Sequence, residues 1–326
     1  MSNKLVSEVD REAEAYLIEY KGDNMDLYHK FAEILDHKNV LIDEPMSKHT
    51  TFKIGGKADY FVTPNNHKAL WQIITLCKEN YIPYYIIGNG SNLLVGDGGF
   101  TGVIIQISSN LSKIDVTDNY VKAEAGAMLS KITSIALEKE LKGLEFAAGI
   151  PGTFGGAVMM NAGAYGGEMK DVIESVRVLD EHGQLKTLTN EELELGYRTS
   201  ILTRKPYVVI DGILKLENGN REEILGLMKD LADRRISKQP LEYPSAGSTF
   251  KRPEGYFAGK LIADAGLKGF QIGGAQVSNK HAGFVINVGD ATAKDVITLM
   301  EEVKGIVFEK YGVELKAEVK QIGNFR

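Results

Sequence analysis

The sequence has a single cysteine, few prolines and no large excess of charge, and each of these shortages excludes a class of protein. Cys77 is the only cysteine among 326 residues, so the chain can form no internal disulfide bond and has no thiolate cluster for a metal. The six histidines are scattered, without an HxH or HxxxH pair, and we predict no metal site. A net charge of −6 gives no indication of a nucleic-acid partner.

The sequence also lacks a segment that suits a signal peptide or a membrane span. Residues 1–20 are charged and contain no continuous apolar run. The uncharged stretch at 146–167 is long enough for a span, but its glycines and Pro151 would break a helix through the middle. We therefore expect a cytoplasmic protein with no membrane partner, and we expect a monomer.

Glycine is abundant, with 35 residues against 8 prolines. Seven glycines lie in the stretch AAGIPGTFGGAVMMNAGAYGG at residues 147–167, where bare backbone would let a flat ring or a phosphate approach closely. A second loop, GNGSN at 88–92, follows the apolar run YYII and suits a diphosphate. Leu93 stands where a Rossmann fingerprint has its third glycine. The two loops together predict a dinucleotide site outside the Rossmann plan, and the alternative is a glycine-rich buried turn.

Hydrophobic periodicity predicts an α/β arrangement in the first part of the chain. A helix is predicted over residues 1–38, with a break at Gly22, and a second helix follows Pro64. The inner face of that second helix is formed by four residues at helical spacing: Leu70, Ile73, Ile74 and Cys77. Strands are predicted at 40–42, 57–64, 84–87 and 102–107, and hairpins at 113–125 and 175–189.

Further elements are predicted in the second part of the chain. A capping box at Thr189 and Glu192 predicts a short helix before Gly196. Two longer helices are predicted over 222–237 and 292–310, with inner faces formed by Ile224, Leu227, Met228 and Leu231 and by Val296, Met300, Val303 and Val307. The alternation in VELKAEV at 313–319 predicts a strand that buries Leu315 and exposes Glu318.

Seven motifs occur in a fixed order along the chain: TFKIGGKADYFVTP, IIGNGSNLLV, GLEFAAGIPGTFGGAVMMNAGAYGGEM, GYRTSIL, SAGSTFKRPEG, AGKLIADAGLKGFQIGGAQVSNKHAGFVIN and LKAEV. Together they resemble the UDP-N-acetylenolpyruvoylglucosamine reductases, also called UDP-N-acetylmuramate dehydrogenases. The resemblance covers about residues 49–322, and GIPGTFGGA and AGSTFKRP are its most specific parts.

This resemblance implies an α+β protein in which two α/β subdomains cradle FAD, as in the FAD-binding PCMH-type fold, and a C-terminal α+β domain binds the substrate. The corresponding division is an N-terminal helical extension and lead-in at 1–50, FAD-binding subdomains at 51–110 and 111–220, and a substrate-binding domain at 221–326. The last strand is expected to return toward the active site.

The resemblance also implies an NADPH-dependent flavoprotein oxidoreductase of peptidoglycan synthesis. NADPH reduces FAD, and a hydride then passes to the enolpyruvyl group of UDP-N-acetylglucosamine enolpyruvate, which becomes UDP-N-acetylmuramate. Neither glycine-rich loop contains a histidine or a cysteine for covalent attachment, so we expect FAD to be bound non-covalently.

Matching motifs imply individual roles. The three catalytic residues are Arg198, Ser248 and Glu318. The FAD-binding residues are Gly88, Asn89, Gly90, Ser91, Asn92, Gly149, Ile150, Pro151, Gly152, Thr153, Gly155, Gly156, Asn161, Gly163 and Ala164. The substrate-binding residues are Tyr197, Lys251, Arg252, Lys280 and His281.

The chemistry of the three catalytic residues is compatible with these roles. Hydride delivery to one carbon of an enol ether leaves negative charge on the other carbon, which the protein must stabilise and then protonate. Arg198 offers a permanent cation, Ser248 a proton if its neighbours hold it in place, and Glu318 a polarising group if burial keeps it protonated. Taken without the resemblance, the same residues would be a surface ion-pair arginine, a turn serine and a solvated glutamate.

One form of the family has an extra tyrosine loop, and two other functions compete with the reductase. The segment between Gly269 and Val285 is too short for the extra tyrosine loop that one form of the family has, so the chain resembles the shorter form and the residue that closes over the sugar is not identified.

Two other functions compete: an FAD-dependent oxidase or dehydrogenase acting on an alcohol or hydroxy acid, and a nucleotide-binding protein without turnover. The first should lack AGSTFKRP and LKAEV, and the second should have lost a catalytic residue.

Overall fold

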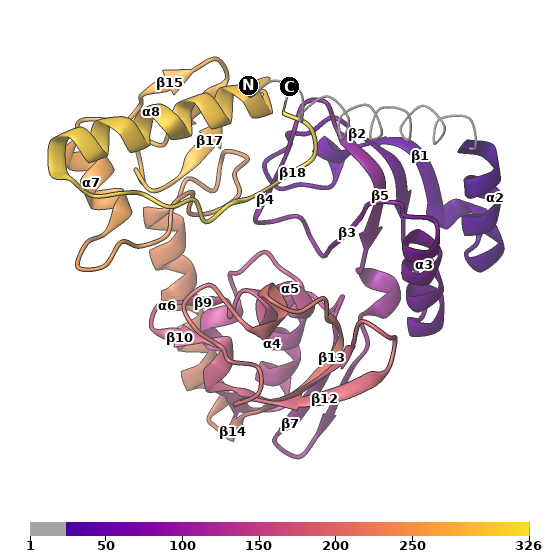
Figure 1. The fold of residues 1–326 in the computed structure, drawn as a ribbon. Coiled ribbons are helices and arrows are strands. Elements are labelled where there is room, and N and C mark those ends of the chain that lie inside the picture. Colours follow the sequence, from indigo (N-terminus) through magenta and orange to yellow (C-terminus); the bar gives the residue numbers. More distant parts are fainter. Residues whose placement is uncertain (1–23, 326) are drawn as a thin grey trace.

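The computed structural model describes residues 24–325, which form three units around a common centre (Figure 1). The first unit comprises residues 24–111, the second 114–218 and the third 258–311, and α6 (Arg221–Lys238) connects the second unit to the third. Of the helix predicted over 1–38, the structure describes α2 (Asn24–Ile34). The predicted break at Gly22 lies outside the described residues.

The first unit is built on a four-stranded sheet with the order β1–β2–β5–β3. β1 (Val40–Pro45) is antiparallel to β2 (Lys57–Val62), whereas β5 (Phe100–Gln106) is parallel to both β2 and β3 (Tyr84–Ile87). α3 (His67–Glu79) packs against this sheet with its four predicted inner residues buried, which confirms that prediction. Burial raises the pKa of the Cys77 thiol to about 12, so this cysteine is a packing residue.

The second unit is built on a five-stranded antiparallel sheet with the order β12–β11–β13–β7–β6. Its strands are β6 (Ile114–Thr117), β7 (Tyr120–Glu124), β11 (Ile173–Leu179), β12 (Leu185–Thr189) and β13 (Val208–Lys215). Both predicted hairpins are present, with left-handed residues at their turns: Asp118 at φ +52° and Gly183 at φ +76°. α4 (Leu129–Glu138) and α5 (Phe154–Met159) bury their apolar residues in the same core.

The third unit combines a small antiparallel sheet with two helices. The sheet contains β15 (Gln271–Ile272), β16 (Ala275–Val277) and β17 (Val285–Asn287), and the helices are α7 (Ala258–Asp264) and α8 (Ala293–Tyr311). α8 begins with a capping box between Thr292 and Asp295 and ends at Gly312 in the left-handed conformation. All four of its predicted inner residues are buried, which confirms that helix.

The remaining elements are short. They are η1 (His37–Asn39), η2 (Met46–Lys48), β4 (Leu93–Val95), η3 (Ser109–Leu111), β8 (Leu141–Lys142), η4 (Glu145–Ala147), β9 (Gly163–Ala164), β10 (Gly167–Glu168), η5 (Met169–Asp171), η6 (Ile201–Thr203), β14 (Glu217–Asn218) and β18 (Lys320–Ile322). No helix within residues 24–325 combines the length and the apolar character that crossing a membrane requires.

The inner face predicted for α6 is partly right. Ile224 is buried and Met228 and Leu231 are half-buried, but Leu227 is 46% exposed. The reason is the place of α6 in the fold, since it runs from the second unit to the third and has its main contacts with α4, β8 and η4 (Figure 1). A helix that bridges two units leaves apolar residues uncovered that a core helix would bury.

Two other predicted elements do not form. The reciprocal hydrogen bonds of a capping box between Thr189 and Glu192 are present, but they close only a turn, because Glu194 adopts a left-handed φ of +47°. Residues 313–319 form no strand: they make a single bridge, between Ala317 and Phe250. The partner segment cannot extend this pairing, since Gly247 (φ +74°) and Pro253 end it on either side.

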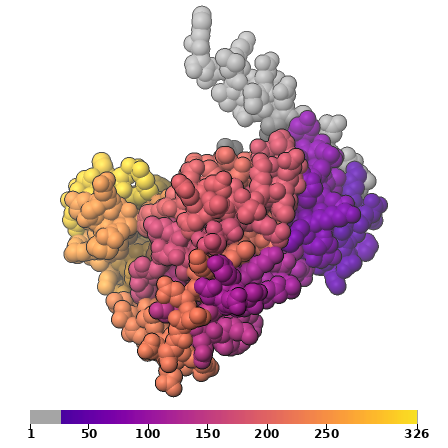
Figure 2. Space-filling view, turned by 90° about the horizontal axis from the view of Figure 1, so that it is seen from below, coloured from indigo at the N-terminus to yellow at the C-terminus, as the bar shows by residue number. Residues whose placement is uncertain are grey.

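The end of the chain returns to the first unit. β18 pairs in parallel with β4, and the carboxylate of Asp97 accepts hydrogen bonds from the backbone N–H groups of Ala293 (2.7 Å) and Lys294 (2.9 Å) at the start of α8. The first and third units are held together by these contacts, by the bond from Asn287 to the carbonyl oxygen of Phe52 (3.3 Å) and by a shared core that includes Ile54 and Leu94. Seen from below, the second unit fills the middle of the molecule between the indigo first unit and the orange-to-yellow third unit (Figure 2).

The first and second units meet at Trp71 of α3. A methyl group on Gly183, in the β11–β12 turn, would lie 2.1 Å from Cε2 of Trp71, so only glycine fits beneath the indole. Close by, the ammonium group of Lys78 donates a hydrogen bond to the carbonyl oxygen of Glu181 (2.8 Å).

We expect Gly183→Ala to lower the free energy of unfolding more than Gly312→Ala does. Both glycines are left-handed, so each substitution costs about 1–2 kcal/mol in backbone strain. Only Gly183 faces Trp71, whereas Gly312 has open space around it. Urea denaturation of the two variants measures the difference.

The same substitution in Trp71→Ala protein tests the cause of that difference. In Trp71→Ala protein, the steric conflict is absent, and Gly183→Ala should cost no more than Gly312→Ala. An excess cost that persists without the indole would show that Trp71 does not set the requirement for glycine.

Candidate active site

The two predicted glycine-rich loops lie against each other. The side-chain amide of Asn89 donates a hydrogen bond to the carbonyl oxygen of Pro151 (2.9 Å). A Cβ atom on Gly88 would lie 2.2 Å from the hydroxyl of Thr153, so this approach requires glycine. Loops 60 residues apart in the sequence thus form one surface of bare backbone between the first and second units.

The loop at 88–92 has hydrogen-bonding capacity that the protein does not use. Within residues 24–325, none of its five backbone N–H groups donates to a protein acceptor, although the loop is half-buried to buried. Buried N–H groups normally have a partner. A run of unpaired N–H groups in a glycine-rich loop is typical of a phosphate-binding loop, so this loop fits the diphosphate of a dinucleotide.

The loop at 149–156 is held mainly through its backbone. Gly152 accepts a hydrogen bond from the N–H of Leu129, and the N–H groups of Phe154 and Gly155 donate to carbonyl oxygens of residues 127 and 125. These bonds fix residues 149–153 in front of α4 and α5, with no charged side chain in the loop. An uncharged surface of this kind fits a flat, largely apolar ring system such as a flavin.

Asn161 differs from the other residues predicted to bind FAD, because its side chain is fully buried and engaged with the protein. Its amide donates to Glu168 (3.0 Å) and to the carbonyl oxygen of Gly196 (3.1 Å), and its oxygen accepts from the N–H of Lys170 (2.9 Å). Asn161 therefore anchors both the loop containing Gly163 and the turn that follows Gly196.

The turn at residues 196–199 carries two of the predicted site residues. Gly196 and Thr199 exchange backbone hydrogen bonds, which places Tyr197 and Arg198 at the tip of a two-residue turn. Arg198 adopts a left-handed φ of +55°, a conformation that favours glycine. Strain of this kind at a non-glycine residue is characteristic of functional sites.

Arg198 reaches across to the end of the chain. Its Nε donates to Oε1 of Glu318 (2.6 Å), and its Nη2 donates to the carbonyl oxygen of Gly163 (3.4 Å). Glu318 is itself held by its backbone: its N–H donates to Thr249 (2.8 Å), and its carbonyl oxygen accepts from the side chain of Asn92 (3.2 Å). The catalytic candidates are thus connected to the phosphate-binding loop.

Glu318 is buried, in contrast to its expected exposure on the polar side of a strand. Burial raises the pKa of Glu318, and the neighbouring charges of Arg198 and Lys251 only partly oppose this rise. The structure therefore favours the protonated form of this carboxyl group more than water does.

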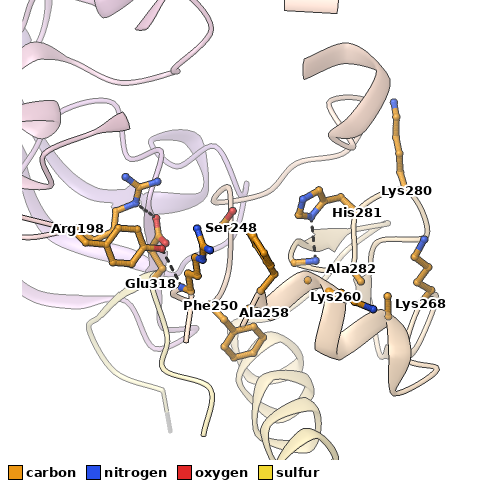
Figure 3. A pocket seen from close by; sticks show the side chains of 16 residues that line it. Arg198, Ser248, Phe250, Ala258, Lys260, Lys268, Lys280, His281, Ala282 and Glu318 are labelled. Carbon is orange, nitrogen blue, oxygen red and sulfur yellow. Dashed lines mark hydrogen bonds and ion pairs between the residues drawn. The ribbon is translucent and has the colours of Figure 1, made fainter. Parts of the chain in front are cut away.

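These residues line one pocket of about 340 Å³ between the second and third units. Figure 3 shows Ser248 between the Arg198–Glu318 pair on one side and His281 on the other. Within the described chain, no protein group forms a hydrogen bond with the Ser248 hydroxyl, which leaves it available to a ligand. Four of the five predicted substrate-binding residues line the pocket: Tyr197, Arg252, Lys280 and His281.

Lys251 does not line the pocket, and its N–H pairs with the carbonyl oxygen of Lys316 (2.8 Å). Sequence reasoning also missed pocket residues, among them Phe250, Phe257, Lys260 and Lys268. Phe250, Lys260 and Lys268 lie within the quoted motifs and Phe257 lies between two of them, but no spacing rule distinguishes these four from core or surface residues.

The end of the pocket near His281 is cationic. Lys260 pairs with Asp264 (2.6 Å) and Lys280 with Glu242 (3.7 Å), whereas Lys268 forms no ion pair with a described residue. Burial lowers the pKa of His281, and Lys268 adds to this effect, so the ring is neutral at pH 7. Its Nδ1 accepts from the N–H of Gly283 (3.1 Å), which leaves the proton on Nε2.

Comparison with known proteins gives matches over nearly the whole chain. The family described as "FAD binding domain" matches residues 58–189, and the family described as "UDP-N-acetylenolpyruvoylglucosamine reductase, C-terminal domain" matches residues 239–322. These matches confirm the predicted combination of a PCMH-type FAD-binding fold with a C-terminal α+β domain. They also support FAD as the cofactor.

Individual relatives agree with the family matches. The UDP-N-acetylenolpyruvoylglucosamine reductase of Clostridium perfringens is 55% identical over 299 residues, covering 92% of this chain and 98% of the relative. That of Alkaliphilus oremlandii is 53% identical over 301 residues, covering 92% and 99%. The crystal structure of the Thermus caldophilus reductase is similar with a TM-score of 0.73 and 36% identity, over 86% of this chain and 97% of that one.

We expect Arg198→Ala to raise the pKa of Glu318 further, because the positive charge and the hydrogen bond of Arg198 both lower it. A folded-state pKa above the unfolded value gives stability that is complete below the unfolded pKa and lost as the pH rises through the folded pKa. Urea denaturation between about pH 5 and 8 should therefore show Arg198→Ala losing stability relative to Arg198→Ala/Glu318→Gln as the pH rises. A constant difference across this range would contradict the raised pKa.

Proposed function

The chain belongs to the UDP-N-acetylenolpyruvoylglucosamine reductase family, and we propose that it reduces the enolpyruvyl group of UDP-N-acetylglucosamine enolpyruvate to give UDP-N-acetylmuramate, a step of peptidoglycan synthesis. FAD, when bound, supplies the hydride that it takes from NADPH. The observation that carries this proposal is the convergence of Arg198, Glu318 and Ser248 in a pocket with one cationic end.

The proposed division of labour follows the three units. Residues 51–110 and 111–220 hold FAD between their glycine-rich loops, and residues 221–326 bind the UDP-sugar, with the lead-in at 1–50 before them. The backbone N–H groups of 88–92 receive the diphosphate of FAD, and residues 149–156 with Gly163 and Ala164 line the rest of the cofactor.

Arg198 stabilises the charge that the reaction creates. A hydride added to the terminal carbon of the enolpyruvyl double bond leaves an electron pair on the carbon that bears the carboxylate, and the charge spreads into that carboxylate as an enolate. The guanidinium of Arg198 is permanently charged, and Nη1 stays free beyond the bonds of Nε to Glu318 and of Nη2 to Gly163. It is therefore suited to hold the carboxylate and the developing enolate.

Ser248 supplies the proton that completes the product. Its hydroxyl has no described protein partner, and its neighbour Thr249 is fixed by bonds to Gly283 (2.9 Å) and Val285 (2.8 Å). The hydroxyl is thus presented by a rigid segment and remains free to donate to the carbanionic carbon. Burial raises the pKa of Glu318 and so favours its protonated form, which polarises the enolate alongside Arg198.

The cationic end of the pocket binds the diphosphate of the UDP-sugar. Lys268 and Lys280 supply positive charge there, neutral His281 supplies an Nε2–H donor, and Arg252 lies between this end and Tyr197. Tyr197 borders the reacting group. Lys251, which does not line the pocket, acts through its charge near Glu318.

An anaerobic visible spectrum tests the proposed function directly. The FAD-loaded protein should lose its yellow colour with NADPH and regain it when the enolpyruvyl UDP-sugar is added. Bleaching without recovery would leave a flavoprotein with a different acceptor, and oxygen consumption with candidate alcohols would then test an oxidase. A protein that stays colourless with added FAD would overturn the flavin assignment itself.

We expect Ser248→Ala to bleach with NADPH at the wild-type rate but to recover its colour about 10²–10⁴-fold more slowly, since only the second half-reaction needs this proton donor. Stopped-flow absorbance measures both steps. Ser245→Ala, three residues earlier in the same loop and outside the pocket, is the matched control. Recovery at the control rate would remove Ser248 from the mechanism.

We expect FAD to be released when the protein is precipitated with acid. The backbone of His49 lies beside Gly90 of the loop at 88–92, but its ring stacks on Phe61 (3.9 Å between ring centroids) and bonds to Glu44 (3.0 Å), and Cys77 is buried in the core. Neither side chain is placed to bond the flavin. The absorbance of the supernatant measures the release, and flavin that stays in the pellet would contradict non-covalent binding.

A further inference from the structure

One side chain of the pocket has no role in the steps above. The ring of Phe257 lines the pocket yet is 58% exposed. The guanidinium carbon of Arg252 lies 3.9 Å from the centroid of this ring, which is the separation of a cation stacked on an aromatic face. An exposed aromatic ring held in one orientation at a pocket edge is a surface on which a ligand can pack.

A chain of contacts locates this stacked pair between the two ends of the pocket. On one side, the N–H of Arg252 donates to the hydroxyl of Tyr197 (3.0 Å), which is next in sequence to Arg198. On the other side, Gly259 follows Phe257 by two residues, and a Cβ atom there would lie 3.3 Å from Cε1 of His281. The pair therefore lies between the reacting end and the cationic end.

The covalent order of the substrate matches this arrangement. In the UDP-sugar of the proposed function, the sugar ring connects the enolpyruvyl group to the diphosphate. With the enolpyruvyl group at Arg198 and the diphosphate at the cationic end, the part of the substrate that passes the stacked pair is the sugar. The pocket volume of about 340 Å³ is near the lower end of ligand pockets, so the substrate must extend over the exposed edge.

We propose that Phe257, held by Arg252, is the platform on which the N-acetylglucosamine ring of the UDP-sugar packs. This inference rests on the proposed function and identifies the residue that covers the sugar in a chain too short for a tyrosine loop. The apolar C–H face of the sugar packs on the free face of the phenyl ring. Phe257 is thus a substrate-positioning residue and takes no part in the proton or hydride transfer.

Arg252 prepares the platform before the substrate arrives. Its guanidinium forms no ion pair with a described residue, and its Nε donates to the carbonyl oxygen of Tyr256 (3.3 Å). Stacking and this bond fix the orientation of both side chains, so less conformational freedom is lost on binding. The two terminal nitrogen atoms of Arg252 remain free to donate to oxygen atoms of the sugar.

Binding measurements on the FAD-loaded protein test the platform with two probes, UDP and UDP-N-acetylglucosamine, which differ only in the sugar. In wild-type protein the sugar should add affinity. We expect Phe257→Ala to weaken binding of UDP-N-acetylglucosamine about tenfold and to leave UDP binding unchanged. Phe257→Tyr, which keeps the aromatic face, should bind both probes as the wild type does.

Phe308→Ala is the matched control. Phe308 is also 58% exposed but lies on α8 outside the pocket, so its removal should change neither affinity. Phe257 makes no side-chain capping bond to α7, so its substitution should not unfold that helix. An unchanged rate of bleaching with NADPH would confirm that the flavin site of Phe257→Ala is intact.

Two results would overturn the platform. Equal losses of affinity for UDP and UDP-N-acetylglucosamine in Phe257→Ala would show that the ring contacts the base or the phosphates. Stacking of the nucleobase on the ring would give this result. Unchanged affinity for both would show that the ring contacts no part of the ligand. Failure of the wild type to recover its colour with the enolpyruvyl UDP-sugar would instead refute the proposed function, while the ratio of the two affinities would still report on Phe257.

Discussion

The arrangement of the site depends on one ion pair, that between Arg198 and Glu318. The two residues are 120 positions apart and come from different parts of the fold, yet Nε and Oε1 are 2.6 Å from each other in a partly buried environment. Removing charges from water is costly, and such a pair is maintained only when its surroundings fix both partners. Here Asn161 anchors the turn that carries Arg198, and Thr249 and Asn92 hold the backbone of Glu318. The loop at 88–92, the loop that contains Ser248 and the end of the chain are therefore brought together by the groups that position this pair.

The three units contribute unequally to that arrangement. The first and third are joined by the β18–β4 pairing and by the carboxylate of Asp97 at the start of α8, so Ser248, Glu318 and Asn92 belong to one connected body. The second unit carries Arg198 and reaches the third through α6, whose side chains are mostly exposed. The distance between the Arg198 guanidinium and Ser248 consequently depends on how the second unit lies against the other two. The Arg198–Glu318 bond is a direct contact between the second unit and the rest.

Patterns carried by contiguous residues predicted the fold well, and patterns that depend on distant partners did not. The inner faces of α3 and α8, both hairpin turns and the glycine-rich loops follow from local spacing and from turn residues. The strand predicted at 313–319 does not form because its partner is a loop bounded by Gly247 and Pro253. Leu227 of α6 is exposed, against the prediction, because that helix bridges two units. For the same reason, residue spacing assigned Glu318 to solvent, and only the resemblance of the surrounding motif indicated a catalytic role. Lys268 and Phe257 could not be selected from the sequence, because their significance comes from which residues face them across the pocket.

The burial of Glu318 has a consequence for the electrostatics of the reaction. An ionised Glu318 would neutralise much of the positive charge of Arg198 at the place where negative charge develops on the substrate. Burial raises the pKa of this carboxyl group and favours its protonated form, in which it donates a hydrogen bond and leaves the charge of Arg198 uncompensated. When Glu318 is ionised, its pair with Arg198 holds the site together. When Glu318 is protonated, Arg198 gives the site a net positive charge that faces the enolate. Because burial raises the pKa of Glu318 while Arg198 opposes that rise, one pair of side chains serves both to hold the units together and to stabilise the transition state.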